Sequence, residues 1–143
     1  ITEKTKISTE FTYLNYLAQQ AGGLSDKMFN ENPYQSNRKR NWFNLDWFLY
    51  NFKLESDLNK NTSLGINFFG LNAKRKSLGF RSNRVDQIDP LQERDLIFGD
   101  FNNFGLESKL LTKYKILNKK SIFLLGLKYY NSNNTGEQGP GIN

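Results

Sequence analysis

The 143-residue sequence predicts an all-β fold, namely about five strands of an antiparallel, up-and-down transmembrane β-barrel. First, apolar and polar residues alternate along several segments, as they do on a strand with one apolar face and one polar face. Second, short turns and long loops alternate along the chain, which places the turns at one end of the sheet and the loops at the other. Third, aromatic residues, 15% of the chain, gather near the loop-side ends of the predicted strands, as in the girdle of a membrane barrel.

The clearest alternation runs through residues 102–131. In its first segment one row is apolar: Phe104, Leu106, Leu110, Tyr114 and Ile116. The opposite row is polar or charged: Asn103, Glu107, Lys109, Lys113 and Lys115. A second segment, beyond a short polar turn, has an apolar row of Phe123, Leu125, Leu127 and Tyr129. Because successive strand side chains point to opposite faces, we predict a β-hairpin of strands 102–116 and 121–131.

Three further strands are predicted upstream, at residues 2–13, 42–58 and 63–73. A polar turn at residues 59–62 joins the last two. Within the middle strand the apolar row changes parity, from that of Trp47 to that of Phe48 and Phe52. One extra residue in a strand flips every later side chain, so this change predicts a β-bulge near Phe48–Tyr50.

Long loops are predicted at residues 14–41, 74–101 and 132–143, so residues 1–143 form part of a single outer-membrane barrel domain. In the first loop, Ser25 is placed to cap a short helical turn that starts at Asp26. All three prolines, Pro33, Pro90 and Pro140, fall in predicted loops. That is expected because proline cannot donate a hydrogen bond to a strand ladder.

The composition argues against several kinds of chemistry. The chain has no His and no Cys, which removes thiolate and imidazole ligands, nucleophiles and bases. The acidic residues between Asp86 and Asp95 lie in one loop, and no phosphate-binding loop or EF-hand motif occurs. We therefore expect no enzyme activity, no catalytic residues, no metal site and no cofactor. No run of 18 apolar residues occurs, so no transmembrane helix is expected either.

The chain is basic, with 20 Lys and Arg against 14 Asp and Glu, and its charge is concentrated in the predicted loops. The candidate ligand-binding residues are Arg38, Arg40, Arg75, Arg81 and Arg84. Guanidinium groups bind carboxylates through two parallel hydrogen bonds, so an anionic ligand is the functional interpretation. Contact with lipopolysaccharide phosphates and simple solvation are the alternatives. Nucleic acid is not expected, because the basic residues are spread over two loops and the second half of the second loop is acidic.

Several runs resemble a known family. They are TYLNYLAQQAGGL at 12–24, RNWFN at 40–44, NFFGL at 67–71, DFNNFGLE at 100–107 and GEQG at 136–139. Together they are similar to TonB-dependent outer-membrane receptors of the iron(III)-dicitrate type found in Bacteroidetes-like bacteria. The resemblance implies a many-stranded barrel around an N-terminal plug domain. Nothing in this sequence looks like the plug or its TonB-contacting box, and about five strands cannot close such a barrel. We therefore expect a fragment from the middle of the barrel.

The resemblance implies import of a ferric chelate, a siderophore similar to ferric citrate, across the bacterial outer membrane. The chelate is then the transported ligand, not a cofactor. The implied partners are lipid and lipopolysaccharide, the rest of the barrel, and a TonB-type energising complex that acts through the plug. Two alternatives remain open: a small soluble β-barrel that carries an apolar ligand, and a barrel or adhesin of the outer membrane that transports nothing.

Overall fold

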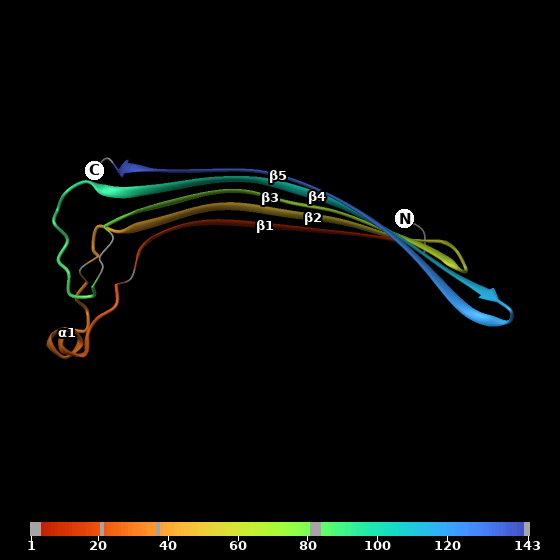
Figure 1. The fold of residues 1–143 in the computed structure, drawn as a ribbon, viewed down its shortest axis with the longest axis horizontal. Coiled ribbons are helices and arrows are strands. Elements are labelled where there is room, and N and C mark those ends of the chain that lie inside the picture. Colours follow the sequence, from red (N-terminus) through yellow and green to blue (C-terminus); the bar gives the residue numbers. More distant parts are fainter. Residues whose placement is uncertain (1–3, 21, 37, 81–83, 142–143) are drawn as a thin grey trace. The chain divides into compact units, whose positions relative to one another are not determined.

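The chain forms one sheet of five long strands. The computed structural model describes residues 4–20, 22–36, 38–80 and 84–141. The elements are β1 (Thr5–Gln19), α1 (Asp26–Glu31), β2 (Trp42–Asn59), β3 (Thr62–Gly79), β4 (Arg94–Ile116) and β5 (Lys119–Gly141). The strands are hydrogen-bonded in the order β1-β2-β3-β4-β5, and Figure 1 shows them following one another in chain order. The predicted all-β, antiparallel, up-and-down arrangement is confirmed, and the described strands do not close into a barrel.

The strands run further than the residue pattern predicts. On the long-loop side, β1 extends to Gln19 and β3 to Gly79, while β4 already begins at Arg94. The prediction of a loop at residues 132–143 was wrong, because β5 continues to Gly141 and includes Pro140. A proline is tolerated there because β5 is an edge strand. These extensions do not alternate strictly between apolar and polar residues: Lys74–Lys76 places three charges in a row within β3, and Leu96–Phe98 places three apolar residues in a row within β4. A strand ladder is built from backbone N–H and C=O groups and does not need alternating side chains. The pattern therefore detects only the part of each strand that has one apolar face.

Two tight turns connect the strands at the other end of the sheet. Between β2 and β3, the side chain of Asn59 accepts a hydrogen bond from the Asn61 amide at 2.8 Å. Between β4 and β5, both residues of the turn have positive φ, 47° at Leu117 and 62° at Asn118. Two left-handed residues in a two-residue hairpin loop are typical of a type I′ turn, whose twist matches that of the flanking strands.

The connection between β1 and β2 contains the short helix α1. Ser25 is its N-cap, and the Ser25 hydroxyl accepts a hydrogen bond from the Met28 amide at 3.3 Å. This contact satisfies one of the amides that have no partner within the first turn of a helix. The helix cap predicted from the sequence is confirmed.

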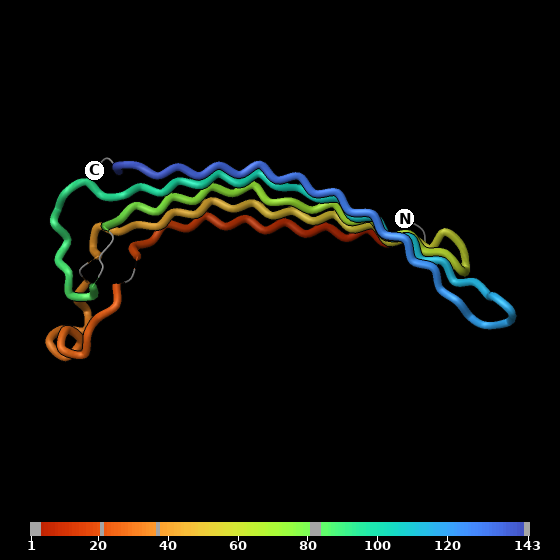
Figure 2. Tube along the Cα trace, in the orientation of Figure 1, coloured from red at the N-terminus to blue at the C-terminus, as the bar shows by residue number. Residues whose placement is uncertain are grey.

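The chain divides into two compact units. Unit 1 consists of Ile1–Tyr13, Trp47–Asn72 and Phe101–Asn134, and unit 2 consists of Leu14–Asp46, Ala73–Asp100 and Thr135–Asn143. Each unit contains segments of all five strands. The Cα trace in Figure 2, coloured from red at β1 to blue at β5, lets the reader follow how the strands supply these segments in turn.

Unit 1 has two chemically different faces. Its aromatic face carries a ladder of rings that crosses all five strands: Phe11, Phe48, Tyr50, Phe52, Phe68, Phe104 and Tyr129. Neighbouring ring centroids lie between 5.3 and 6.4 Å apart, within the range of favourable aromatic pairs. Phe48, Tyr50 and Phe52 contact one another along a single face, so the predicted bulge near Phe48–Tyr50 is not needed to explain this part of β2. The opposite, polar face holds Lys53, Glu107 and Lys128.

Gly70 shows how closely the ladder packs on the sheet. The ring of Tyr50 lies over Gly70, where it occupies the space of a side chain. A Cβ atom at this position would also lie 2.7 Å from the carbonyl oxygen of Asn103. Only glycine fits this position without displacing a neighbour, which explains its presence inside a strand.

Little apolar surface is buried by this fold. Ala73 is the only buried apolar residue in the described part of the chain. Large side chains of the aromatic face remain exposed, for example Phe11 at 57% and Tyr129 at 56%. No helix among the described residues is long and apolar enough to cross a membrane.

Candidate functional site

Arg40, one of the predicted ligand-binding residues, is held by an acidic partner in unit 2. Its Nε donates to Asp89 Oδ2 at 2.8 Å and its Nη2 donates to Asp89 Oδ1 at 3.0 Å, which is the bidentate arrangement. The same Nη2 also donates to the Gln92 carbonyl oxygen at 2.8 Å. Arg94, which the sequence analysis did not single out, donates in turn to the Arg40 carbonyl. These contacts bind the segment before β2 to the connection between β3 and β4.

Asp89 is the centre of this cluster, which we call the Arg40–Asp89 clasp. Besides its two bonds to Arg40, it accepts a hydrogen bond from the Leu91 amide at 2.9 Å, which forms a turn across Pro90. Leu91 has a φ of 59° there, a left-handed conformation stabilised by that bond. The Asp89 side chain is only 12% exposed. The hydrogen bonds from Arg40 lower the pKa of the Asp89 carboxyl below its ordinary value, so it stays ionised.

A second set of polar contacts joins the same two segments. Asn41 is 3% exposed. Its carboxamide donates to the Phe80 carbonyl at 3.0 Å and accepts from the Phe80 amide at 2.9 Å. A carboxamide has one acceptor and one donor group, so it can pair with a backbone as a neighbouring strand does. The clasp and Asn41 together fix both long connections of unit 2.

The other predicted arginines do not join this cluster in the same way. Arg38 lies half-buried in the segment before β2, and Arg84 is exposed in the connection after β3. Arg75 lies within β3, not in a loop, and the strand alternation places its side chain on the face opposite Lys74 and Lys76. The three basic residues Lys74–Lys76 are therefore divided between two faces. Arg81 lies outside the residues that the structure describes.

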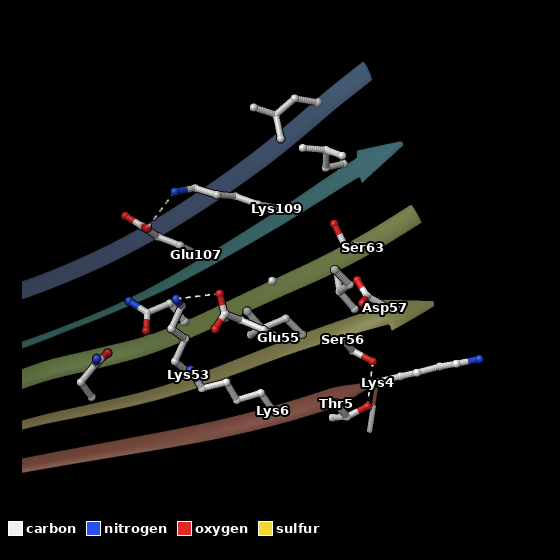
Figure 3. A pocket seen from close by; sticks show the side chains of 17 residues that line it. Lys4, Thr5, Lys6, Lys53, Glu55, Ser56, Asp57, Ser63, Glu107 and Lys109 are labelled. Atoms are coloured by element: carbon white, nitrogen blue, oxygen red, sulfur yellow. Dashed lines mark hydrogen bonds and ion pairs between the residues drawn. The ribbon is translucent and has the colours of Figure 1, made fainter. Parts of the chain in front are cut away.

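The polar face of unit 1 contains a groove that the sequence analysis did not predict as a site (Figure 3). Its volume is about 730 Å³. Charged residues supply much of its lining: Lys4, Lys6, Lys53, Glu55, Asp57, Glu107 and Lys109. Figure 3 shows Lys53 turned toward Glu55 and Lys109 toward Glu107, at 2.8 and 4.0 Å. Glu107 also pairs across the strands with Lys128 at 2.8 Å.

Several of these charges are paired within the groove, whose lining holds four lysines and three acids. Acids and bases alternate along β2 and β4, so that Lys53 and Lys109 each have a carboxylate two residues away on the same face. Exposed ion pairs of this kind contribute little to stability. The pairing of Lys53 with Glu55 and of Lys109 with Glu107 reduces the positive charge that an anionic ligand would meet in the groove.

A smaller hollow of about 310 Å³ lies beside the groove on the same face. Asn51, Asn103, Phe69 and Tyr130 line it, together with Glu10 and Thr12. The Oδ1 atoms of Asn51 and Asn103, and that of Asn67 in the neighbouring groove, are buried without a hydrogen-bond partner in the described residues. These asparagines lie on the polar rows of three adjacent strands, and this placement is the sequence signal that could have indicated the hollow.

Comparison with known proteins identifies no relative of this chain. No family model matches the sequence, and no curated protein or solved structure matches it. In the described part of the chain, no group of three or more His, Cys, Asp or Glu residues is arranged to hold a metal ion.

Proposed function

We propose that this chain is part of the wall of a transmembrane β-barrel in a bacterial outer membrane. The observation that carries the proposal is the contrast between the two faces of unit 1. The aromatic face presents uncovered rings on five adjacent strands, and the polar face presents a groove of paired charges. Lipid outside and water inside are the two environments that match such a sheet.

A soluble carrier barrel accounts less well for these faces. Such a barrel would turn its apolar rows inward and bury them. Here the rows are uncovered, and exposed apolar patches beyond a few hundred Å² mark a surface that contacts protein or membrane. Exposed apolar side chains of the aromatic face include Ile7, Phe11, Phe52, Leu106, Phe123, Leu127 and Tyr129. Acyl chains would cover all of them at once, without a specific partner for each strand.

The two edges of the sheet indicate that more strands complete the barrel. β1 and β5 are the outermost strands, so each has one side without a neighbour in the sheet. In hydrocarbon every unpaired backbone N–H or C=O costs several kcal/mol, which is why sheets cross membranes only as closed barrels. We therefore propose that other strands of the parent barrel pair with β1 and β5.

Within this class we propose a TonB-dependent receptor that imports a ferric chelate similar to ferric citrate. The support is the sequence resemblance together with the long, basic connections of unit 2. Exposed Arg84 is the candidate for direct contact with a carboxylate chelate. Arg40 acts by ordering the loops through Asp89. Lipopolysaccharide is a further partner of the basic loops, and a TonB-type complex would energise transport through a plug domain.

Cysteine scanning tests the membrane proposal directly, because the chain contains no Cys of its own. Leu106→Cys and Leu127→Cys would carry a polarity-sensitive fluorophore on the aromatic face. Glu107→Cys and Lys128→Cys are their sequence neighbours and serve as matched controls on the polar face. With the parent barrel assembled in phospholipid vesicles, we expect blue-shifted emission from the first pair and water-like emission from the second. Blue-shifted emission from the first pair in buffer without vesicles would instead support the soluble carrier and refute the membrane assignment.

The receptor proposal needs the parent protein in its source cells. A heat-modifiable outer-membrane species well above 16.7 kDa that binds radioactive ferric citrate is the expected result. An outer-membrane species that binds no ferric chelate would leave the barrel assignment standing and point to a barrel that does not transport iron. A species of 16.7 kDa in the soluble fraction would refute both.

A further inference from the structure

We infer that the hollow on the polar face of unit 1 binds a neutral, polyhydroxylated ring compound, that is, a saccharide. The first argument is the unmet hydrogen-bonding capacity of its walls. Asn103 is 9% exposed, and its Oδ1 atom has no partner within the described residues although it lies in a fold that pairs other buried polar groups. Asn51 lies in β2, separated from Asn103 in β4 by β3, and its Oδ1 atom is also buried without a hydrogen-bond partner. A buried polar atom without a partner is costly unless a ligand supplies the bond.

The second argument is the aromatic lining of the same hollow. Phe69 and Tyr130 stack with their ring centroids 6.5 Å apart and an interplanar angle of 27°. The Phe69 ring lies over Gly105, where a Cβ atom would approach the ring to 2.5 Å, so the ring rests flat against the sheet. Tyr130 is 54% exposed and presents its surface to solvent. An aromatic face carries partial negative charge and attracts the weakly positive C–H groups on one side of a sugar ring.

The charges around the hollow disfavour an anionic ligand. Glu10 lines the hollow and would repel an anion, including a carboxylate chelate. The cation nearest the rings, Lys128, lies 5.8 Å from the Phe69 ring centre and is already paired with Glu107 at 2.8 Å. Hydroxyl groups donate and accept at one atom, so they can pair with carboxamide oxygen and nitrogen atoms and with the Glu10 carboxylate.

The size and position of the hollow fit a small ring compound better than a peptide. Its volume of about 310 Å³ is at the low end of the range for small-molecule sites. Its lining comes from all five strands, from Glu10 of β1 to Tyr130 of β5, so it lies across the face of the sheet. An extended peptide would instead add along the backbone of one edge strand. The inference does not depend on the membrane proposal, because none of its lining side chains except that of Tyr50 belongs to the aromatic face.

Adjacent tyrosines on opposite faces provide a matched test. The full chain, in amine-oxide detergent without a sugar headgroup, is titrated with glucose, galactose, maltose and cellobiose by saturation-transfer NMR and calorimetry. We expect binding of at least one of them with saturation of its ring protons. Tyr130→Ala should weaken that binding roughly tenfold, and Tyr129→Ala should leave it within about twofold. The two side chains are similarly exposed, at 54% and 56%, so they should tolerate substitution equally.

A second variant tests the amide wall. Asn103→Leu keeps the approximate shape of the side chain and removes its hydrogen-bonding groups, so saccharide binding should fall roughly tenfold while the far-UV circular dichroism stays unchanged. Absence of binding by all four saccharides would overturn the inference. Equal weakening by the two tyrosine variants would do the same, as would tighter binding of a trialanine peptide than of every saccharide. Each of these results is independent of the vesicle experiment above, so the two proposals fail separately.

Discussion

A charge placed on the aromatic face of unit 1 should be much more costly than the same charge placed on the polar face. Leu110 and Leu111 are neighbours in β4, and both are half-buried. Leu111 lines the charged groove of the polar face. Alternation along the strand places Leu110 on the other face, with Phe104 of the aromatic ladder. Leu110→Arg and Leu111→Arg therefore make the same chemical change one residue apart.

The expected difference follows from the depth of Leu110 in a membrane. Phe104 and Tyr114 are the aromatic residues on either side of it along this face of β4. The ten steps between them span about 34 Å at roughly 3.4 Å per residue, which a strand tilt of about 40–45° reduces to about 25 Å, the height of the apolar band of an outer-membrane barrel. Leu110 then lies near the middle of that band. Arginine facing lipid at the midplane costs about 2–4 kcal/mol, and the cost on the wet face should be small.

Urea denaturation of each variant of the parent barrel in phosphatidylcholine vesicles, followed by tryptophan fluorescence, measures these costs. A loss of about 2–4 kcal/mol corresponds to a roughly 30- to 700-fold change in the folding equilibrium constant, well within the range of the assay. Lys109→Ala, on the polar face, should have little effect and controls for substitution in β4. If Leu111→Arg proved as costly as Leu110→Arg, or more costly, our assignment of the two faces would be refuted.

Three further predictions concern the Arg40–Asp89 clasp, the turn between β4 and β5, and the close packing at Gly70. Because Arg40 lowers the pKa of Asp89, the clasp contributes stability above the ordinary carboxyl pKa, and this stability is lost as the pH falls through the lower folded-state value. The hydrogen-exchange protection factors of the loops of unit 2 should therefore fall over that acidic range, and Asp89→Ala should remove the dependence. Leu117→Asn should stabilise the hairpin by about 1 kcal/mol in thermal denaturation, because asparagine tolerates the left-handed conformation better than leucine. Gly70→Ala should destabilise the chain by about 1–3 kcal/mol, since the new methyl group would meet the Asn103 carbonyl at 2.7 Å.

Each of these has a control within the same chain. Asp26→Ala removes a carboxylate from α1 and should leave the acid dependence of the clasp intact. If this variant also lost the acid dependence, the effect would come from the overall charge of the chain and not from Asp89. Leu117→Val places a β-branched residue at positive φ and should destabilise the turn. This result would show that the gain from asparagine does not come merely from removing leucine. Gly126→Ala is the control for Gly70, because its Cβ would lie 3.9 Å from the nearest neighbour atom. Equal costs for the two glycines would indicate a loss of backbone entropy or strand geometry and not a steric clash.

The sequence predicted the strands most accurately where each has one apolar face. The predicted strands 42–58 and 102–116 lie close to β2 and the end of β4, and the two tight turns fall where expected. In β2, however, the parity change was attributed to a bulge. Trp47 and Leu49 lie on the polar face although they are apolar, while Phe48, Tyr50 and Phe52 form the ladder. Periodicity alone cannot distinguish an apolar residue on a wet face from a change of register.

The loop residues were harder to interpret, because charge in a sequence carries no information about its partner. Arg40 reads as a ligand-binding residue until Asp89, far away in the chain, is found beside it. The arginine at position 75 was placed in a loop, yet the ladder carries β3 past it to Gly79. The asparagines of the hollow gave no local signal either, since an asparagine on a polar row is ordinarily solvated.

The sequence by itself determined the class of this protein: antiparallel strands with one apolar row, tight turns at one end and long connections at the other. These features are local, since they depend on side-chain alternation and turn chemistry over a few residues. The tertiary structure decided which charges are paired and where two asparagines with an unpartnered Oδ1 atom lie beside two stacked rings. Such features depend on the register between strands, which brings residues that are distant in the sequence to within a few ångströms and leaves no mark in either segment alone.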